Sequence, residues 1–124
     1  MPLEMQELSE QIIGAAIKVH TELGPGFIES IYENALAIEL RSRGLTISQQ
    51  LEIPVKYLGI EVGLHRLDLL VEGNFVVELK AIKKIEDLHF AIVKSYLKAI
   101  RAKHGLILNF SQTKLEAKRV IQSR

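Results

Sequence analysis

Two apolar segments between His65 and Lys80 constrain the fold of this chain more than any other feature. They are typical of two β-strands joined by a tight turn around Gly73. Ionisable residues interrupt both segments, Asp68 in the first and Glu78 and Lys80 in the second. A buried charge is costly unless it is paired or bound to a metal. Charged residues within such strand-like sequence therefore need a reason, which is either a functional site or an ion-pair cluster on a solvated face of the sheet.

The register of this hairpin depends on the length of its turn. A three-residue turn at 72–74 would place Asp68 opposite Glu78 on one face of the sheet. The same register would place Arg66 opposite Lys80. A turn of only two residues would instead put the two carboxylates on opposite faces, because side chains alternate along a strand. The sequence leaves both turns open, and a shared site requires the longer one.

Two adjacent carboxylates beside cations favour one kind of chemistry. The carboxylates repel each other, and one of them would be protonated unless a cation compensates. Mg²⁺, or Mn²⁺ in its place, accepts carboxylate and carbonyl oxygens and keeps several bound waters. A neighbouring lysine can then orient a water or stabilise charge on a phosphate. This combination is suited to hydrolysis of a phosphodiester bond in DNA or RNA.

The composition is that of one soluble globular domain, residues 1–124, long enough to bury a core without disulfides. The chain has no cysteine, which excludes thiolate metal sites and favours a reducing cytoplasm. No apolar run of about 18 residues and no signal peptide is present, so we expect a cytoplasmic protein without membrane contact. The net charge is only +1, so any surface for nucleic acid must come from local clustering of cations. Such a cluster, equally typical of a solvated helix face, comprises Lys83-Lys84, Lys94, Lys98, Arg101 and Lys103.

The rest of the chain alternates between helical and strand-like patterns. Ser9 is expected to cap the first helix after a loose start at 1–7, and Pro54 indicates an edge strand because proline cannot donate to a ladder. An irregularity is expected at Gly63. The expected fold is a mixed α/β domain with two N-terminal helices, a sheet of about four strands and a right-handed crossover helix. The predicted helices cover residues 9–23, 27–43 and 86–102 and a C-terminal tail within 111–124, and the predicted strands cover 46–57, 60–71, 75–82 and 105–110.

Two residues of the second predicted helix bear on the site. Glu29 lies in the first turn, where the helix dipole favours a carboxylate by about 0.3–1 kcal/mol, so it has a structural explanation beside a functional one. Tyr32 shares the same stripe and is expected to pack, with its hydroxyl at the rim of the site. His20 and His89 show no ligand spacing, so we interpret both as structural histidines.

An Asp, nine residues and then Glu-x-Lys, from Asp68 to Lys80, is a spacing that resembles the PD-(D/E)XK nuclease superfamily. The segment Gly26-Phe27-Ile28-Glu29-Ser30-Ile31-Tyr32 matches the pattern for which the GxxExxY family is named. The resemblance to that family extends from about Ser9 to Phe110. Its other segments are Leu23-Gly24-Pro25-Gly26, Arg66-Leu67-Asp68-Leu69-Leu70-Val71-Glu72, Val77-Glu78-Leu79-Lys80-Ala81 and Leu108-Asn109-Phe110.

The resemblance implies a restriction-endonuclease-like core and a Mg²⁺-dependent nuclease. In that superfamily the Asp and the Glu bind the metal, the lysine assists the attacking water, and a Glu from the preceding helix completes the site. These roles would fall on Asp68, Glu78, Lys80 and Glu29. The backbone carbonyl of Leu79 would be a further metal ligand by the same analogy.

One position departs from the family pattern. Related sequences commonly carry a Gln on the crossover helix four residues before a Tyr, whereas here Ile92 precedes Tyr96. An apolar side chain cannot replace the hydrogen bonds of an amide. A second hypothesis is therefore a catalytically weak or inactive nuclease-fold module that binds nucleic acid or protein.

Supporting roles and assembly stay open at this stage. Tyr96 would support the site, and Arg66 would either contact phosphate or form a salt bridge to Asp68 or Glu78. A homodimer through the edge strand near Pro54 is a further alternative. A small catalytic domain would also suit a protein partner that selects its target.

Overall fold

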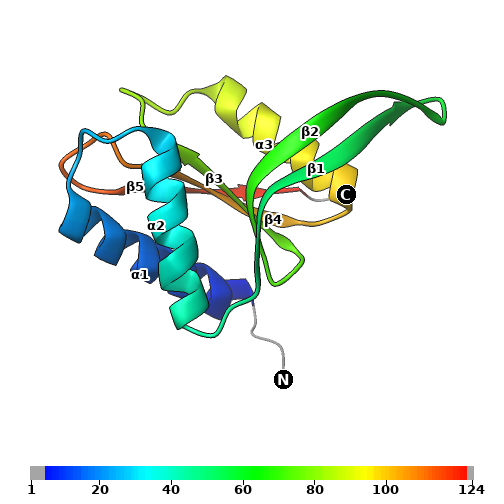
Figure 1. The fold of residues 1–124 in the computed structure, drawn as a ribbon. Coiled ribbons are helices and arrows are strands. Elements are labelled where there is room, and N and C mark those ends of the chain that lie inside the picture. Colours follow the sequence, from blue (N-terminus) through cyan, green and yellow to red (C-terminus); the bar gives the residue numbers. More distant parts are fainter. Residues whose placement is uncertain (1–4, 123–124) are drawn as a thin grey trace.

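A mixed β-sheet separates two layers of helices in this protein (Figure 1). The computed structural model describes residues 5–122. Its strands lie in the order β1-β2-β3-β4-β5, and β3 and β4 run parallel while every other neighbouring pair is antiparallel. The elements are α1 (Met5–Leu23), α2 (Glu29–Ser42), β1 (Ile47–Tyr57), β2 (Ile60–Val71), β3 (Phe75–Lys80), α3 (Asp87–Ile100), β4 (His104–Asn109) and β5 (Glu116–Ile121).

The N-terminal helix begins earlier than the sequence predicts. Ser9 does not cap it, because α1 already begins at Met5 and Ser9 lies buried within it. Leu8, one residue earlier, is also fully buried. Burial of the apolar stripe through this extra turn outweighs the preference of serine for a cap position. Of the start that was expected to be loose, residues 5–7 are helical and residues 1–4 lie outside the described range.

The prediction of a C-terminal helix is wrong. Residues within 111–124 instead form β5, which pairs antiparallel with β4 and makes the sheet five-stranded rather than four-stranded. The ladder satisfies backbone groups along β4 that would otherwise be an open edge. Val120 of β5 is 1% exposed and packs in the core beneath α3. The helical spacing of its apolar residues concealed this strand, because Glu116–Ile121 lacks the alternation of apolar and polar residues that marks a half-buried strand.

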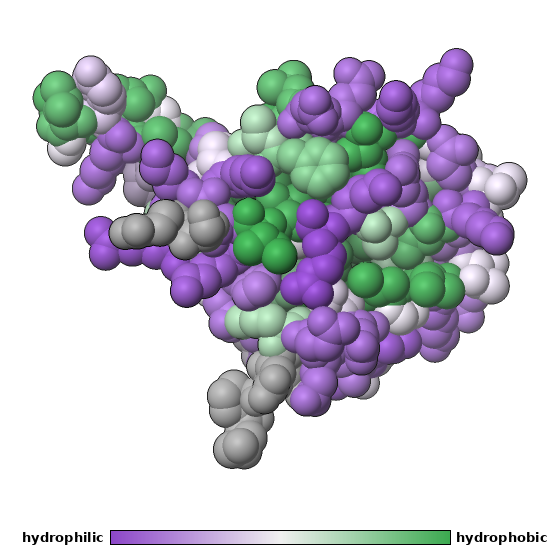
Figure 2. Space-filling view, turned by 180° about the vertical axis from the view of Figure 1, so that it is seen from behind, coloured by the Kyte–Doolittle hydropathy of each residue, from purple (hydrophilic) through white to green (hydrophobic). Residues whose placement is uncertain are grey.

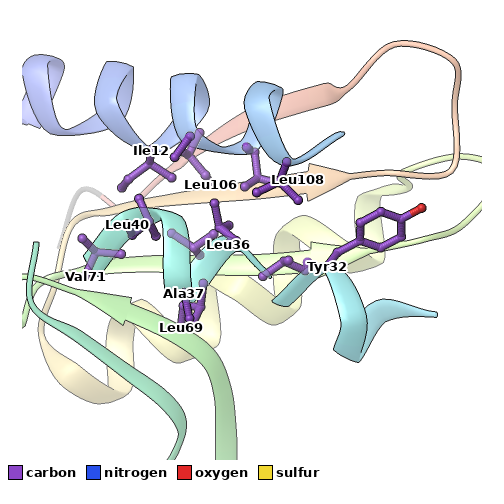
Figure 3. Packing of buried hydrophobic residues seen from close by; sticks show 14 of the residues in the cluster. Ile12, Tyr32, Leu36, Ala37, Leu40, Leu69, Val71, Leu106 and Leu108 are labelled. Carbon is purple, nitrogen blue, oxygen red and sulfur yellow. The ribbon is translucent and has the colours of Figure 1, made fainter. Parts of the chain in front are cut away.

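Buried side chains form one cluster on each face of the sheet. Figure 3 shows α1 and α2 packing against side chains from β2 and β4 on the first face. On the second face α3 packs closely, since a Cβ added to Gly105 would lie 3.1 Å from both the carbonyl oxygen of Val76 and Cγ1 of Val93. The parallel β3–α3–β4 unit is the crossover that the sequence predicts. None of the described helices is long and apolar enough to cross a membrane.

The β1–β2 hairpin extends beyond the body of the protein (Figures 1 and 2). Pro54 lies in β1, which is an edge strand as predicted. Val55 pairs with Gly63 but Lys56 pairs with Glu61, so β2 carries one extra residue next to Gly63, where an irregularity was expected. Large hydrophobic side chains gather toward the tip in Figure 2. The exposed ones on this hairpin are Tyr57, Leu58, Ile60, Val62 and Leu64.

Candidate active site

The turn between β2 and β3 has three residues, so the register that a shared site requires is the one observed. Val71 pairs with Phe75, and the ladder continues to Leu69 and Val77. Glu72 and Gly73 adopt left-handed conformations within the turn, with φ of 54° and 74°. The same register would next bring Asp68 opposite Glu78. The ladder ends one pair before them, and the two strands diverge at this point.

Asp68 makes its hydrogen bonds where the two strands part. Its Oδ2 accepts a hydrogen bond from the backbone N–H of Leu79 at 2.9 Å. Its Oδ1 accepts a hydrogen bond from Nε2 of Gln50 at 3.3 Å. Burial raises the pKa of Asp68, partly against these two hydrogen bonds, which lower it. The carboxylate is therefore held at the end of β3 with both oxygens engaged.

Glu78 is the most electrostatically strained group of the site. It is 7% exposed, and burial together with the charge of Asp68 raises its pKa to about 8. Its Oε2 lies 3.5 Å from Nζ of Lys80, while its buried Oε1 has no hydrogen-bond partner among the described residues. At neutral pH this carboxyl is mainly protonated, and a metal cation bound beside it would favour the ionised form.

Tyr96 reaches the same site from α3. Burial and then the charges of Glu78 and Asp68 raise its pKa to about 12, so the phenol stays protonated beside the carboxylates. Its ring meets the ring of His65 edge to face, with centroids 4.6 Å apart. Tyr96 thus connects the carboxylates to β2 of the hairpin.

Glu29 faces the site from the first turn of α2. Its Oε2 accepts a hydrogen bond at 3.0 Å from the backbone N–H of Ala81, the residue after β3. Its charge is also one of the causes that raise the pKa of Asp68. A surface hollow of about 590 Å³ is lined by both carboxylates and by Gln50 and Glu33. The structure therefore brings the four predicted site residues Glu29, Asp68, Glu78 and Lys80 to the carboxyl end of β3.

Tyr32 is a packing residue that fixes the loop before α2. It is fully buried, and its ring stacks on Phe110 with centroids 4.5 Å apart. Its hydroxyl donates a hydrogen bond to the carbonyl of Gly24 at 2.6 Å and accepts one from the N–H of Phe27 at 3.1 Å. Phe27 lines the hollow at the site, so Tyr32 acts on the site through this loop.

Both histidines that were interpreted as structural have structural partners. His20 is buried, and its Nε2 lies 2.9 Å from the carbonyl oxygen of Gln112 and 3.2 Å from that of Phe110. His89 accepts a hydrogen bond from the backbone N–H of Glu86 at 2.8 Å and belongs to the capping box of α3. Within residues 5–122 neither belongs to a group of side chains that could hold a metal ion.

Arg66 does not join the site. Of the two roles that the sequence leaves open for Arg66, the salt bridge to Asp68 or Glu78 is not formed, because Arg66 pairs with Glu52 at 2.8 Å, directly opposite on β1. Its side chain is 63% exposed. The divergence of β2 from β3 also prevents its expected pairing with Lys80, since the ladder has ended before that position.

Sequence reasoning missed the polar support that β1 and α2 give to Asp68. Gln50 donates to Asp68 and, at 2.7 Å, to Oε1 of Glu33. Glu33 lies four residues after Glu29, which was the one available signal for a shared helix face. Nothing in the strand-like alternation marks Gln50. Ile92 stands where related sequences carry a Gln, and it has no amide. The side-chain amide that reaches Asp68 comes instead from Gln50 on β1.

The donor set fits a hard divalent cation. It offers two carboxylates at one point and a buried carboxyl oxygen without a hydrogen bond. Within residues 5–122 no group of three or more His, Asp or Glu side chains forms a ready metal cage. Mg²⁺ is commonly held by one or two carboxylates with several waters, so this smaller set suffices for it.

A mixed sheet between helical layers, with Asp, Glu and Lys where two strands part, defines a restriction-endonuclease-like α/β protein. The family model described as the PD-(D/E)XK nuclease superfamily matches residues 6–120, and the chain belongs to that superfamily. A search of curated proteins gave no match.

Two solved structures share the fold. One is an alkaline exonuclease from Laribacter hongkongensis, with a TM-score of 0.56 and 11% identity over 99% of this chain and 73% of that one. The other is the crystal structure of SSO0001, with a TM-score of 0.60 and 16% identity over 75% of this chain. The match spans 49%, about half, of the SSO0001 chain.

Proposed function

We propose that this protein is a Mg²⁺- or Mn²⁺-dependent nuclease that hydrolyses phosphodiester bonds of DNA or RNA. The observation that carries the proposal is the buried, unpartnered Oε1 of Glu78 beside Asp68 and Lys80. Within the superfamily we assign the chain to the GxxExxY group, on the segment from Gly26 to Tyr32. The Glu of that segment is Glu29, which faces the site from α2.

The residues of the site divide the work of such a reaction. Asp68 and Glu78 would hold the cation, with the backbone carbonyl of Leu79 as a further ligand. Glu29 would complete the site from α2 without joining them in a three-carboxylate cage. The bound cation would polarise the phosphate and lower the pKa of a water bound to it. Lys80, whose ammonium lies 3.5 Å from Glu78, would orient the attacking water or stabilise charge developing on the phosphate.

A groove between the hairpin and α3 offers a path for the substrate backbone. Its volume is about 880 Å³, and its lining carries Lys56, Lys98 and Arg101 but no acidic side chain. None of these cations lies within 4 Å of a carboxylate of the described residues. His65 lines the groove and contacts Tyr96, so the groove adjoins the carboxylates. Unpaired cations in a groove suit the phosphates of a nucleic acid.

The proposal is tested by cleavage assays on plasmid DNA, single-stranded DNA and RNA with Mg²⁺ or Mn²⁺. We expect the wild type to cleave at least one of these substrates, and Asp68→Ala and Lys80→Ala to lose at least 100-fold in rate. Lys18→Ala is the matched control, because it removes a lysine of α1 whose partner is Glu39. Equal cleavage by all four proteins would identify a contaminating nuclease and refute the proposal.

The second candidate is a nuclease-fold module that binds nucleic acid or protein without cleaving, and Ile92 on the crossover helix favours it. Calorimetry with Mn²⁺ separates the two candidates. A catalytic site should bind Mn²⁺ and lose that binding in Glu78→Ala. Nucleic-acid binding without Mn²⁺ binding would support the binding module.

A further inference from the structure

Gln50 departs from the strand that carries it. Its neighbours pair regularly with β2, Gln49 with Leu69 and Leu51 with Leu67, but Gln50 itself is left out of the ladder. Its φ is +51°, in the left-handed region that non-glycine residues seldom adopt. Such a conformation costs roughly 1–2 kcal/mol and persists only where the surroundings hold it. Within a regular antiparallel pair it needs a cause, and the position opposite is that of Asp68.

The amide of Gln50 bridges two carboxylates. Its Nε2 donates to Oε1 of Glu33 at 2.7 Å and to Oδ1 of Asp68 at 3.3 Å. Because both neighbours are acceptors when ionised, the NH₂ end and not the carbonyl end must face them. One hydrogen of the NH₂ group is available for each carboxylate.

Glu33 is itself fixed in place on α2. It is 7% exposed, and its second oxygen, Oε2, accepts a hydrogen bond from Nε2 of Gln49 at 2.9 Å. No cation of the described residues lies within 4 Å of it. Among the described residues its buried carboxylate is held by the two glutamine amides, which makes it an anchor for Gln50 and not part of an ion pair.

We propose that Gln50, anchored by Glu33, is a positioning residue that fixes the carboxylate of Asp68 for metal binding. The backbone N–H of Leu79 holds Oδ2 of Asp68 and Gln50 holds Oδ1, so the carboxylate cannot rotate freely. Each oxygen keeps a second lone pair for a cation. The left-handed conformation takes Gln50 out of the ladder, and its amide then reaches both α2 and β2. This role rests on the proposed function, in which Asp68 is a metal ligand.

Gln50→Gly removes the amide and lets the backbone keep its left-handed conformation. Glycine adopts the left-handed conformation without steric cost, so this variant deletes the amide and relieves the strained φ. Gln6→Ala is the control, because it removes a glutamine amide from the exposed surface of α1, where that amide donates to Glu10. Calorimetric titration with Mn²⁺ should show a loss of roughly 10- to 100-fold in affinity for Gln50→Gly and less than twofold for Gln6→Ala.

A second measurement needs no metal. Three-bond NMR couplings to the Cβ protons of Asp68 should report one χ1 rotamer in the wild type and in Gln6→Ala, and averaged rotamers in Gln50→Gly. A single rotamer in Gln50→Gly, or Mn²⁺ affinity equal to that of the wild type, would overturn the role of Gln50. If the wild type binds no Mn²⁺, the proposed function fails, while the couplings still decide whether Gln50 positions Asp68.

Discussion

Replacing Glu78 with glutamine should stabilise the metal-free protein, and more so at higher pH. The folded state raises the pKa of Glu78 from 4.5 to about 8, chiefly through burial and the charge of Asp68. The folded protein therefore binds one more proton than the unfolded chain between these two pH values. Its stability falls as pH rises through this window, because ionisation is easy in the unfolded chain and costly in the folded one. Glutamine has no such dependence.

The size of the effect follows from the two pKa values. A pKa shift of one unit corresponds to about 1.4 kcal/mol. The raised pKa of Glu78 therefore lowers the free energy of unfolding of the wild type by on the order of 5 kcal/mol at pH 9 and by about 3 kcal/mol at pH 7. The free energy of unfolding of Glu78→Gln should thus exceed that of the wild type by a margin that widens by about 4 kcal/mol between pH 5 and pH 9. Urea denaturation of both proteins at five pH values measures this margin directly.

A control variant and added Mn²⁺ both test whether the effect comes from the charge of Glu78. Glu52→Gln removes an exposed carboxylate whose partner is Arg66, and should change stability by less than about 1 kcal/mol at every pH. Mn²⁺ at about 100 times its dissociation constant should restore about 2.7 kcal/mol to the wild type at pH 8, and nothing to Glu78→Gln. A margin between wild type and Glu78→Gln that stays constant with pH would refute the electrostatic reasoning.

Three further substitutions and one control test the framework around the site. Tyr32→Phe removes a hydroxyl bonded to two backbone groups of one loop, so it should lower the free energy of unfolding by about 1–2 kcal/mol in urea denaturation. Gly105→Ala places a Cβ 3.1 Å from the carbonyl oxygen of Val76 and should cost about 1–3 kcal/mol by the same measurement, whereas Gly63→Ala enters open space and should cost less than about 1 kcal/mol. Asn109→Leu should lower the thermal midpoint by several degrees, because the buried amide of Asn109 bonds the loop that follows β3, and circular dichroism measures that midpoint.

The sequence predicted the local elements well, because their signals are local. The strand from Ile60 to Val71 was predicted to the residue, and the second helix ends at Ser42, one residue before its predicted end. The C-terminal segment failed because its local pattern is misleading. It pairs with β4, the strand directly before it, but Glu116–Ile121 lacks the alternation of apolar and polar residues that marks a strand.

The same limit applies within the site. Asp68, Glu78 and Lys80 could be predicted to share a face because a register rule connects them along one hairpin. Gln50 could not, because its role depends on a left-handed φ inside β1 and on Glu33 from another element. Hydrogen bonds between side chains of different elements leave no regular spacing in the sequence.

The divergence of β2 from β3 and the strain of the site have one origin. If the ladder continued one more pair, Asp68 and Glu78 would lie opposite each other, and two like charges there would destabilise the sheet. The strands part instead after Leu69, and the N–H of Leu79 bonds the carboxylate of Asp68. This hydrogen bond stabilises the carboxylate of Asp68. Oε1 of Glu78 stays buried, with no hydrogen-bond donor among the described residues. A cation bound there would satisfy that oxygen and oppose the repulsion together, so the open end of the ladder is both the weakest part of the metal-free sheet and the part best prepared to bind metal.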